Sequence, residues 1–276
     1  MKQENYAAIL EFLHRESGLV LGQDKQYLLD ARLLPIAEQA GLADLDALAQ
    51  KLKAGGDARI NSLVVDAMTT NETYFFRDTH VFTMLFTELL PRIMEERKSE
   101  KKLRIWSAAC STGQEPYSIM MGIERDLPQL AGWKIELVAT DLSPTVLEKA
   151  KNGLYNHFEV QRGLPAPLLV KHFEQVDRHF QAKPELRSKI DFRPLNLKAS
   201  YATLGTFDLI LCRNVLIYFD VETKGDILTR LSRQLSPEGY LLLGASETTV
   251  GLDTPLQKQK LAQAMVFRPQ SAVVPQ

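Results

Sequence analysis

Cysteine is scarce in this chain of 276 residues: there are two, Cys110 and Cys212, and each lies inside an apolar run typical of a buried strand. Two such cysteines do not make a disulfide scaffold, so we expect reduced, buried thiols in an intracellular protein. Long apolar runs are also missing, since no segment approaches the roughly 20 apolar residues that a membrane-spanning helix needs. The N-terminal segment MKQENYAAILEFLHRESG is an apolar stripe broken by charges, unlike a secretory signal. We therefore expect a cytoplasmic protein that does not insert into a membrane.

An excess of charge of either sign is missing as well. The 33 Lys plus Arg and 34 Asp plus Glu give a net charge of −1, which argues against nonspecific binding to nucleic acid or to an anionic membrane. His, Cys and acidic residues do not follow the spacing of a metal site, so we expect no metal. The composition, 45% hydrophobic and 24% charged, is that of an ordinary globular protein. The length suggests one large domain or two modest ones.

Short amphipathic segments fill residues 1–78. Three of them end at glycine, at Gly18, at Gly41 and at the pair Gly55 and Gly56, and the segment ARINSLVVDAMTTN follows. Glycine just past the last apolar repeat is a helix stop, because glycine enters the left-handed conformation at little cost. We predict an all-helical N-terminal domain over residues 1–78.

Strands and helices alternate from residue 103 onwards. LRIWSAAC, KIELVATDLS, FDLILCRNVLIYF and YLLLGASE have the apolar runs of buried strands, and helical segments stand between them. This alternation predicts an α/β fold with a parallel sheet covered on both faces. We expect DILTRLSRQLSPEG to be a helix stopped by Pro-Glu-Gly, and AMVFRP to be the last, antiparallel edge strand.

The predicted organisation therefore has three parts. Residues 1–78 form the helical domain, residues 79–102 a linker or helix, and residues 103–276 the sheet domain. The alternation is interrupted at about 154–195, where RSKIDFRPL suggests a small inserted β subdomain with one or two short strands.

The turn after the first strand is the place to seek a ligand, because open α/β sheets bind at the carboxyl ends of their strands. Small residues line it: Ser107, Ala108, Ala109, Ser111 and Gly113. The pattern is not the G-x-G-x-x-G of dinucleotide enzymes, and a tightly packed turn is the alternative.

The second strand ends at Asp141, whose carboxylate suits the two hydroxyls of a ribose. A helix N-cap is the alternative role for this residue. Together with the turn of small residues, Asp141 favours a nucleoside ligand without distinguishing NAD from S-adenosylmethionine.

The stretch MTTNETYFFRD, residues 68–78, combines Thr and Asn, which bond their own backbone, with three aromatic residues and an arginine. A helix end capped by Thr or Asn, with the aromatics in the core, is one interpretation. The rest of the chain has to decide whether the stretch has another role.

Four motifs, TTNETYFFRD, WSAACSTGQEPYSI, ATDLS and LCRNVLIYF, occur in this order behind a helical domain, and they resemble the CheR family of chemotaxis protein methyltransferases. The resemblance covers roughly residues 5–268. It implies a Rossmann-like sheet with a small inserted antiparallel β subdomain, preceded by an all-helical domain. It also implies methyl transfer from S-adenosylmethionine to glutamates of chemoreceptors, giving γ-glutamyl methyl esters and S-adenosylhomocysteine.

Matched by motif position, the family's cofactor contacts fall on Asn71, Thr73, Arg77, Glu115, Asp141, Asn196, Leu197, Arg213 and Asn214. The family also places an arginine and a tyrosine close to the reacting methyl group, and these match Arg77 and Tyr218. A carboxylate is already a nucleophile at neutral pH, so no general base is needed and alignment is the main requirement. Arg77 suits a planar carboxylate clamp, for either the substrate or the cofactor. The resemblance also implies that TTNETYFFRD is the edge of the helical domain folded over the cofactor, with Asn71, Thr73 and Arg77 turned into the cleft and Phe75 or Phe76 packing the hinge. For Tyr218, a strand-end aromatic in the core is the alternative.

Two departures from the family concern its partners. Some relatives have a basic face on the N-terminal helices, but here residues 1–78 hold 8 Lys plus Arg against 12 Asp plus Glu, so any basic patch is local, around Lys25, Arg32 and Arg59. Some relatives bind a receptor C-terminal pentapeptide through a glycine-containing loop of the insert, and HFEQVDRHFQAKPELRSKIDF has no glycine. We expect a monomeric, pentapeptide-independent enzyme acting on the cytoplasmic domains of chemoreceptors.

Other functions remain open at this point. A non-catalytic S-adenosylmethionine-binding adaptor in a chemosensory array is the main alternative, although Arg77 and Tyr218 are both present. An oxidoreductase lacks its glycine fingerprint, and a small-molecule methyltransferase would not be expected to carry the helical domain. Binding of a regulatory protein to the N-terminal domain is also left open.

Overall fold

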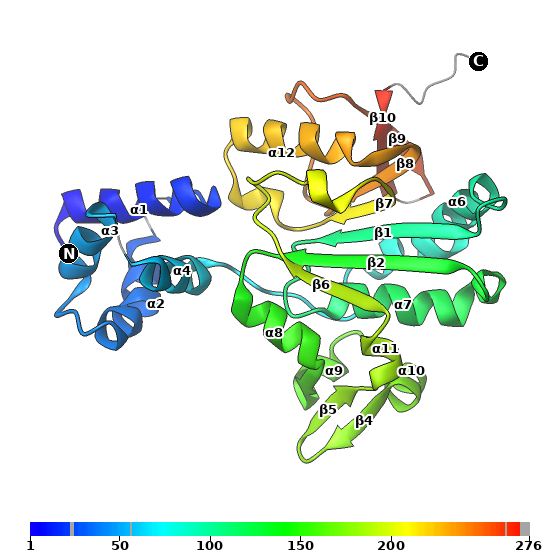
Figure 1. Cartoon of the computed structure of the whole chain (residues 1–276), viewed down its shortest axis with the longest axis horizontal. Coiled ribbons are helices and arrows are strands. Elements are labelled where there is room, and N and C mark those ends of the chain that lie inside the picture. Colours follow the sequence, from blue (N-terminus) through cyan, green and yellow to red (C-terminus); the bar gives the residue numbers. More distant parts are fainter. Residues whose placement is uncertain (23–24, 56, 263, 271–276) are drawn as a thin grey trace. The chain divides into compact units, whose positions relative to one another are not determined.

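The computed structural model describes residues 1–22, 25–55, 57–262 and 264–270. The chain divides into two compact units (Figure 1). The helical unit consists of Met1–Thr70 together with Tyr218–Thr223, and the sheet unit consists of Asn71–Ile217 and Lys224–Gln276. The predicted boundaries at residues 78 and 102 stay predictions, and residues 271–276 of the predicted sheet domain lie outside the described residues.

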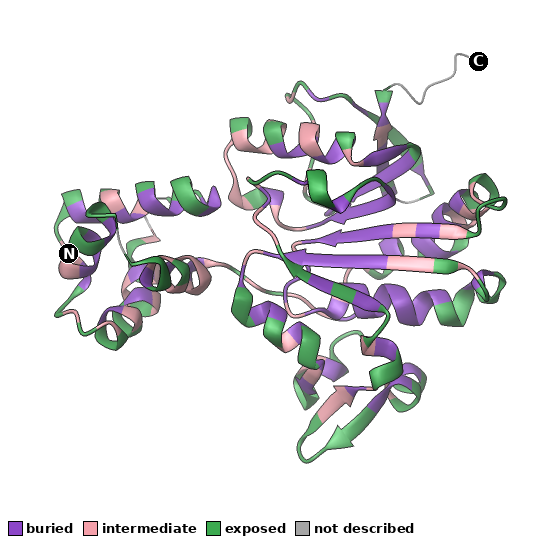
Figure 2. Ribbon diagram, in the orientation of Figure 1, coloured by how far each residue is buried: buried purple, intermediate pink, exposed green. Residues whose placement is uncertain are grey.

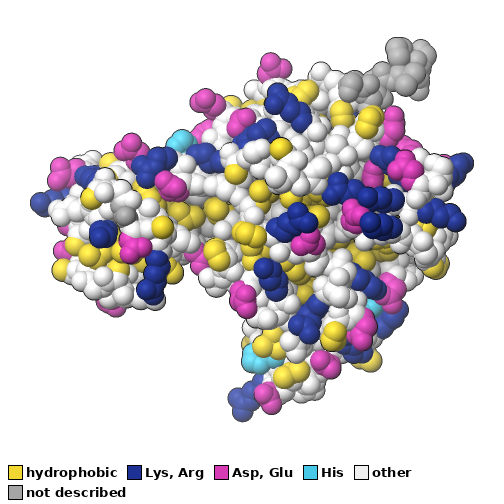
Figure 3. Space-filling view, in the orientation of Figure 1, with side chains coloured by type: hydrophobic (Ala, Val, Ile, Leu, Met, Phe, Trp, Pro, Cys, Tyr) yellow, Lys and Arg dark blue, Asp and Glu magenta, His cyan; other side chains and the backbone are white. Residues whose placement is uncertain are grey.

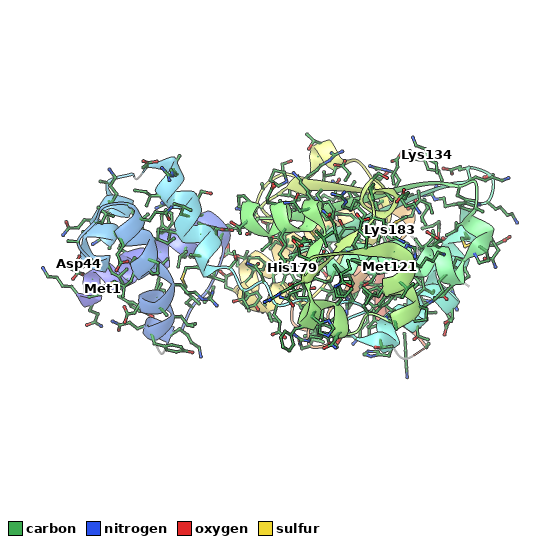
Figure 4. The ribbon with its side chains drawn as sticks, turned by 90° about the horizontal axis from the view of Figure 1, so that it is seen from below. Met1, Asp44, Met121, Lys134, His179 and Lys183 are labelled. Atoms are coloured by element: carbon green, nitrogen blue, oxygen red, sulfur yellow. The ribbon has the colours of Figure 1, made fainter. Side chains whose placement is uncertain are left out.

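The helical unit is built on four α-helices within the described residues. They are α1 (Gln3–Ser17), α2 (Gln26–Gln39), α3 (Leu45–Lys53) and α4 (Ala58–Met68). Each buries one apolar stripe in a common core that includes Ile9, Leu33, Leu48 and Val64. Asp44, labelled in Figure 4, caps α3 by accepting the Ala47 N–H at 2.8 Å.

Glycine marks the helix ends as the sequence predicts. Gly18 is the residue after α1 and has a φ of 78°. Gly41 and Gly55 have φ of 69° and 92°, one residue beyond the caps of α2 and α3; Gly56 lies outside the described residues.

The carboxyl end of α4 is capped by an arginine side chain instead of a glycine. Nη1 of Arg32 donates to the carbonyls of Met68 and Thr69 at 3.2 and 3.0 Å, so this arginine of the predicted basic patch has a structural role.

A mixed sheet of seven strands forms the centre of the described part of the sheet unit, in the order β6-β2-β1-β7-β8-β10-β9. The strands are β1 (Lys102–Ala108), β2 (Lys134–Asp141), β6 (Ile190–Pro194), β7 (Phe207–Cys212), β8 (Leu235–Leu243), β9 (Leu256–Leu261) and β10 (Ala264–Pro269). The five strands β6, β2, β1, β7 and β8 are parallel to one another, and β10 is antiparallel to both β8 and β9. The predicted α/β fold with a Rossmann-like sheet is confirmed.

Helices connect the strands and flank the sheet (Figure 1). Residues 79–96 form one helical segment, in which the π-helical turn η2 (Leu85–Leu89) joins α5 (Thr79–Met84) to α6 (Leu90–Glu96). The other connections contain α7 (Gln114–Asp126), η3 (Pro128–Leu130), α8 (Pro144–Asn152), η4 (Ala202–Leu204), η5 (Leu216–Tyr218) and α12 (Val221–Arg233).

Two strand predictions and one helix-end prediction need correction. AMVFRP forms β10, which is antiparallel as predicted but lies between β8 and β9, so β9 is the edge strand. RSKIDFRPL contains β6, which pairs with β2 in the main sheet instead of belonging to the insert. Pro-Glu-Gly does not stop a helix, because α12 ends at Arg233 and these residues lie in a bulge of β8. Gly239 is needed there, since a Cβ would lie 2.9 Å from the Phe207 carbonyl oxygen.

The insert has its own three-stranded antiparallel sheet, in the order β3-β5-β4. It contains β3 (Leu154–Asn156), α9 (His157–Gln161), α10 (Ala166–His172), β4 (Phe173–Val176), β5 (His179–Ala182) and α11 (Pro184–Arg187). Only Asp177 and Arg178 connect β4 to β5. Lys183, labelled with His179 in Figure 4, donates from Nζ to the Lys171 carbonyl at 2.7 Å near the end of α10.

Both faces of the main sheet are buried, as the continuous apolar runs predict. Leu103 and Ile105 pack in one cluster with α5, η2, α6 and α7. The next residue along β1, Trp106, points to the opposite face with its neighbours Ile210 and Leu241, and all three are fully buried. Figure 2 shows that the central strands are largely buried, whereas the helices have both buried and exposed residues. On the surface, basic and acidic side chains are interspersed (Figure 3).

One helix contact depends on the absence of a side chain. A Cβ on Gly122 of α7 would lie 2.0 Å from the ring of Phe86. We predict that Gly122→Ala lowers the free energy of unfolding by about 1–3 kcal/mol, because Phe86 is displaced from a close-packed core. Urea unfolding followed by circular dichroism measures this change.

Gly225→Ala in α12 is the matched control, because no atom lies within 4 Å of its added Cβ. A glycine inside a helix costs up to about 1 kcal/mol relative to alanine, so this variant is expected to be equally stable or more stable. Equal effects of the two substitutions would contradict the packing argument.

Candidate functional site

Four of the predicted site residues, Glu115, Asp141, Arg213 and Asn214, lie at or shortly after the carboxyl ends of β1, β2 and β7. In the sheet register, Ala108 at the end of β1 pairs with Thr140 of β2 and with Cys212 of β7. The loops that follow these three strands therefore leave the sheet side by side. This is the edge at which open α/β sheets bind their ligands.

The turn between β1 and α7 is conformationally strained. Ala109 and Ser111 have φ of 57° and 51°, a region that side chains other than glycine rarely enter, and Gly113 has a φ of 93°. A Cβ on Gly113 would lie 2.9 Å from the Cβ of Ala150, so the turn packs closely against α8. Strain of this kind is often concentrated at binding sites. The alternative of a tightly packed turn is therefore confirmed, and ligand binding by this turn stays a prediction.

Asp141 is buried and held in one orientation. Its Oδ2 accepts the Ser111 N–H at 2.8 Å and its Oδ1 accepts the Ser143 N–H at 3.0 Å. The N-cap of α8 is Ser143, whose Oγ accepts the Val146 N–H. The alternative role of Asp141 as the helix cap is therefore wrong, and its carboxylate instead links the loops after β1 and β2.

Arg213 is the centre of a buried polar network at the end of β7. Its side chain is 2% exposed, and Nη1 donates to Oε2 of Glu115 at 2.9 Å. Nη2 donates to Oδ2 of Asp78 at 2.6 Å and to the Arg77 carbonyl at 2.9 Å. The other oxygen of Glu115 accepts from Oγ of Ser107 at 2.8 Å. The network joins α7, the loop after β7 and the 71–78 stretch.

The 71–78 stretch is fixed to the sheet unit at several points. The Asn71 carbonyl accepts from Oγ of Ser111 at 2.8 Å. Phe75 and Phe76 are buried in the core of the sheet unit, as the plainer interpretation of this stretch predicts. Arg77 is half-buried, and its Nη1 donates to the Glu72 carbonyl at 2.8 Å. Thr73 is half-buried in the same segment.

The loop after β6 adds two more predicted residues. The N–H of Leu195 donates to the Asp141 carbonyl at 2.9 Å, which places the Asn196–Leu197 pair next to the end of β2. The side chain of Asn196 accepts the Lys198 N–H at 2.9 Å and so shapes its own loop. Leu197 is buried. The structure thus brings Asn71, Glu115, Asp141, Asn196, Leu197 and Arg213 to one edge of the sheet.

Tyr218 belongs to a different unit. Its carbonyl accepts the Val20 N–H at 2.9 Å, and its side chain packs against the core of the helical unit. Two residues later, Oδ2 of Asp220 lies 2.7 Å from Nε2 of His14. Asp220 also accepts the Thr223 N–H at 2.7 Å, and this bond is the main cause that lowers the pKa of Asp220 to about 2. The segment that carries Tyr218 is therefore anchored to the helical unit.

Sequence reasoning missed the roles of Asp78 and Glu247. Glu247 follows β8, and its carboxylate accepts backbone N–H groups of the loop that carries Asn214. The rule that pointed to Asp141, an acidic residue just after a parallel strand, would also have pointed to Glu247.

Neither a thiolate nucleophile nor a metal site is supported by the described residues. Burial raises the pKa of both thiols, Cys110 and Cys212, well above the ordinary value, so neither is a thiolate nucleophile at neutral pH. No three His, Cys, Asp or Glu side chains among the described residues are grouped to hold a metal ion. In the same part of the chain, no helix is long and apolar enough to cross a membrane.

The buried network makes a prediction about stability. Arg213→Ala removes the shared partner of two acidic side chains that are only 23% and 13% exposed. Breaking a buried ion pair typically costs 3–5 kcal/mol, because the remaining charge loses its partner. We expect a loss of about 3 kcal/mol in urea unfolding.

Arg193→Ala is the control, since Arg193 pairs with Asp191 where both side chains are about half exposed. Exposed pairs contribute at most about 1 kcal/mol. An Arg213→Ala variant as stable as Arg193→Ala would show that the network does not hold the loops together.

Comparison with known proteins gives two family matches. Residues 71–265 match the CheR methyltransferase SAM binding domain, and residues 4–69 match the CheR methyltransferase all-alpha domain. The chain is 44% identical over 264 residues to Chemotaxis protein methyltransferase 1 of Pseudomonas aeruginosa, covering 93% of this chain and 94% of that protein. It is 42% identical over 261 residues to Chemotaxis protein methyltransferase Cher2 of Pseudomonas putida, with the same two shares. The chain belongs to the CheR methyltransferase family, and its cofactor is S-adenosylmethionine.

Proposed function

We propose that the protein transfers the methyl group of S-adenosylmethionine to glutamate side chains of chemoreceptors, giving γ-glutamyl methyl esters and S-adenosylhomocysteine. The observation that carries the proposal is the family match across both domains, with relatives named chemotaxis protein methyltransferases that share 42% and 44% of the aligned residues. Methyl-ester formation would serve sensory adaptation. A non-catalytic adaptor is not favoured by these relatives.

The residues at the carboxyl ends of β1 and β2 fit this cofactor. The turn from Ser107 to Gly113 carries small side chains, which would let a ligand approach its backbone closely. Asp141 offers a carboxylate whose orientation is fixed by two backbone N–H groups, and a carboxylate at the end of the second strand suits the ribose hydroxyls. We assign cofactor contacts to Asn71, Thr73, Arg77, Glu115, Asp141, Asn196, Leu197, Arg213 and Asn214.

Within this set, the residues have different tasks. Arg213 and Glu115 hold each other, so we assign them the task of shaping the site through their shared hydrogen bonds. Asp141 and the Asn196–Leu197 pair lie together at the ends of β2 and β6, where they would hold the nucleoside. Asn71 is tied to the same turn through Ser111, so it would cover the site from the side of the 71–78 stretch.

The reaction requires correct positioning of the two reactants more than it requires a general acid or base. When bound, S-adenosylmethionine supplies an electrophilic methyl group on a positively charged sulfur. A glutamate carboxylate is ionised at neutral pH, so no side chain of the protein needs to remove a proton. Arg77 would hold a carboxylate in its planar guanidinium, and Tyr218 would present its hydroxyl near the reacting methyl. Correct alignment of two reactants contributes several powers of ten in rate.

The partners follow from the substrate. We propose that the enzyme works as a monomer on the cytoplasmic domains of chemoreceptors. The helical unit is the surface on which a regulatory protein would bind, if one exists. The two-residue connection between β4 and β5 supports independence from a receptor C-terminal pentapeptide, because the insert offers no glycine-containing loop there.

Methyl transfer to chemoreceptor-containing membranes tests the assignments of Arg77 and Tyr218. We expect Arg77→Ala and Tyr218→Phe to lower kcat by about 10- to 100-fold, because each variant loses a group that aligns the reactants. Radiolabel from S-adenosylmethionine, released by mild alkali, gives the rate, and calorimetry gives the affinity for S-adenosylhomocysteine. Unchanged affinity in Arg77→Ala would place its guanidinium on the substrate, and lost affinity would place it on the cofactor.

Arg162→Ala is the matched control for Arg77. Both guanidinium groups contact the same neighbours, since Arg162 pairs with Oε1 of Glu72 at 2.7 Å and lies 4.2 Å from the Tyr74 ring, and Arg77 lies 5.7 Å from that ring. A disturbed 72–77 segment would affect both variants equally. Equal rates in Arg162→Ala and Arg77→Ala would therefore exclude a direct role of Arg77, and absence of label with the wild type would reject the proposed reaction.

Independence from the receptor tail has its own test. We expect calorimetry to show no saturable binding of a chemoreceptor C-terminal pentapeptide at micromolar concentrations, because the β4–β5 connection is too short to form a peptide-binding loop. S-Adenosylhomocysteine added to the same sample shows that the protein is intact. Tight binding of the pentapeptide would refute the independence.

A further inference from the structure

The carboxylate of Glu247 binds four backbone N–H groups. Its Oε2 accepts from Gly244 at 2.6 Å and from Asn214 at 2.8 Å. Its Oε1 accepts from Val215 at 2.9 Å and from Leu216 at 2.7 Å. Three of the donors belong to the loop after β7, and the fourth to the loop after β8. One side chain therefore ties together the loops of two neighbouring strands.

Three consecutive N–H groups converge on this carboxylate because of the backbone conformation. Asn214 has a φ of 59°, and a left-handed residue within a loop turns successive N–H groups towards a common point, which makes an anion-binding concavity. In this protein the anion is the protein's own side chain. A glutamine side chain has the same shape but would not replace it, because its NH2 group, a hydrogen-bond donor, would face backbone N–H groups that are also donors.

The two loops also touch directly. A Cβ on Gly244 would lie 2.8 Å from the Asn214 nitrogen and 2.7 Å from Oε2 of Glu247. The backbones of the two loops thus lie close together beside the carboxylate.

The loop that Glu247 holds carries assigned site residues. Arg213 and Asn214 open it, and it continues without interruption into η5, whose last residue is Tyr218. At one end the buried Arg213 fixes it to Glu115 and Asp78. Between these bonds and Tyr218, the three N–H groups held by Glu247 set the path of the chain.

We propose that Glu247 is a positioning residue for methyl transfer: by accepting the N–H groups of Asn214, Val215 and Leu216, it holds the loop that places Asn214 at the cofactor and leads to Tyr218. The inference rests on the proposed function, since it concerns the same reaction. Glu247 touches neither substrate nor cofactor in this role. Its effect passes through the loop, so it acts on turnover more than on substrate binding.

Glu247→Gln is the sharpest variant, because it keeps the size of the side chain and removes only one acceptor oxygen and the charge. We expect kcat to fall about 10- to 100-fold, with a smaller change in KM for the receptor, because small displacements of aligned groups are costly in rate. Site-specific amide hydrogen exchange should become at least tenfold faster at Asn214, Val215 and Leu216. Glu247→Ala should be partly rescued by added formate, which supplies a carboxylate to the same N–H groups.

Glu238→Gln is the control variant. Glu238 lies on β8 nearer its start, is half exposed and pairs with Arg268, so its kinetics and the exchange of the three amides should equal those of the wild type. Unchanged exchange of the three amides in Glu247→Gln would overturn the proposal, and so would faster exchange with unchanged kcat.

The exchange measurement does not depend on activity, so it separates a failure of the proposed function from a failure of the role of Glu247. A wild type without methyl transfer would reject the proposed function and with it the role in turnover, whereas the exchange data would still show whether Glu247 holds the loop.

Discussion

The site depends on the buried guanidinium of Arg213. Three segments far apart in the sequence, the 71–78 stretch, the start of α7 and the loop after β7, meet at its Nη atoms. Burying a charge is costly, and the cost is offset only when charged partners and well-directed hydrogen bonds surround it. Two carboxylates and one backbone carbonyl meet that requirement here. The arrangement fixes the 71–78 stretch. The position of Arg77 therefore depends on Arg213, whose side chain donates to the Arg77 carbonyl.

Carboxylates that accept backbone N–H groups organise the rest of this edge. Asp141 connects the loops after β1 and β2, and Glu247 connects the loops after β7 and β8. In both cases an acidic residue just past a parallel strand holds residues that are already in left-handed conformation, Ser111 and Asn214. The same chemistry thus serves two purposes. We propose Asp141 for the ribose of the cofactor, whereas the carboxylate of Glu247 accepts N–H groups of the protein's own loops.

The sequence was sufficient for the fold class and for the glycine-marked ends of α1, α2 and α3, because both depend on local patterns. Apolar runs alternating with helical segments predict the parallel sheet, and the glycine at residue 18 ends α1 where expected. Strand order is a different matter. That β10 is inserted between β8 and β9, and that β6 joins the main sheet, follows from pairings between distant segments, which local patterns do not encode.

For the candidate site, local patterns pointed to Asp141 and the small-residue turn, and the other proposed contacts came from the family resemblance. The ion pair between Glu115 and Arg213 joins residues 98 positions apart, so no spacing rule reveals it. The anchoring of the Tyr218 segment to the helical unit was not foreseen either, since Val20 and His14 give no sign in the sequence of contacting residues 218 and 220.

The proposed reaction methylates a carboxylate oxygen of glutamate side chains. The chemical identity of the product tests this reaction most directly. Chemoreceptor incubated with the enzyme and S-adenosylmethionine would be digested and its peptides fragmented in a mass spectrometer. The account predicts a mass increase of one methylene unit on glutamate residues, which mild alkali removes as expected for an ester. An alkali-stable methyl group, or one on a nitrogen-bearing side chain, would contradict it.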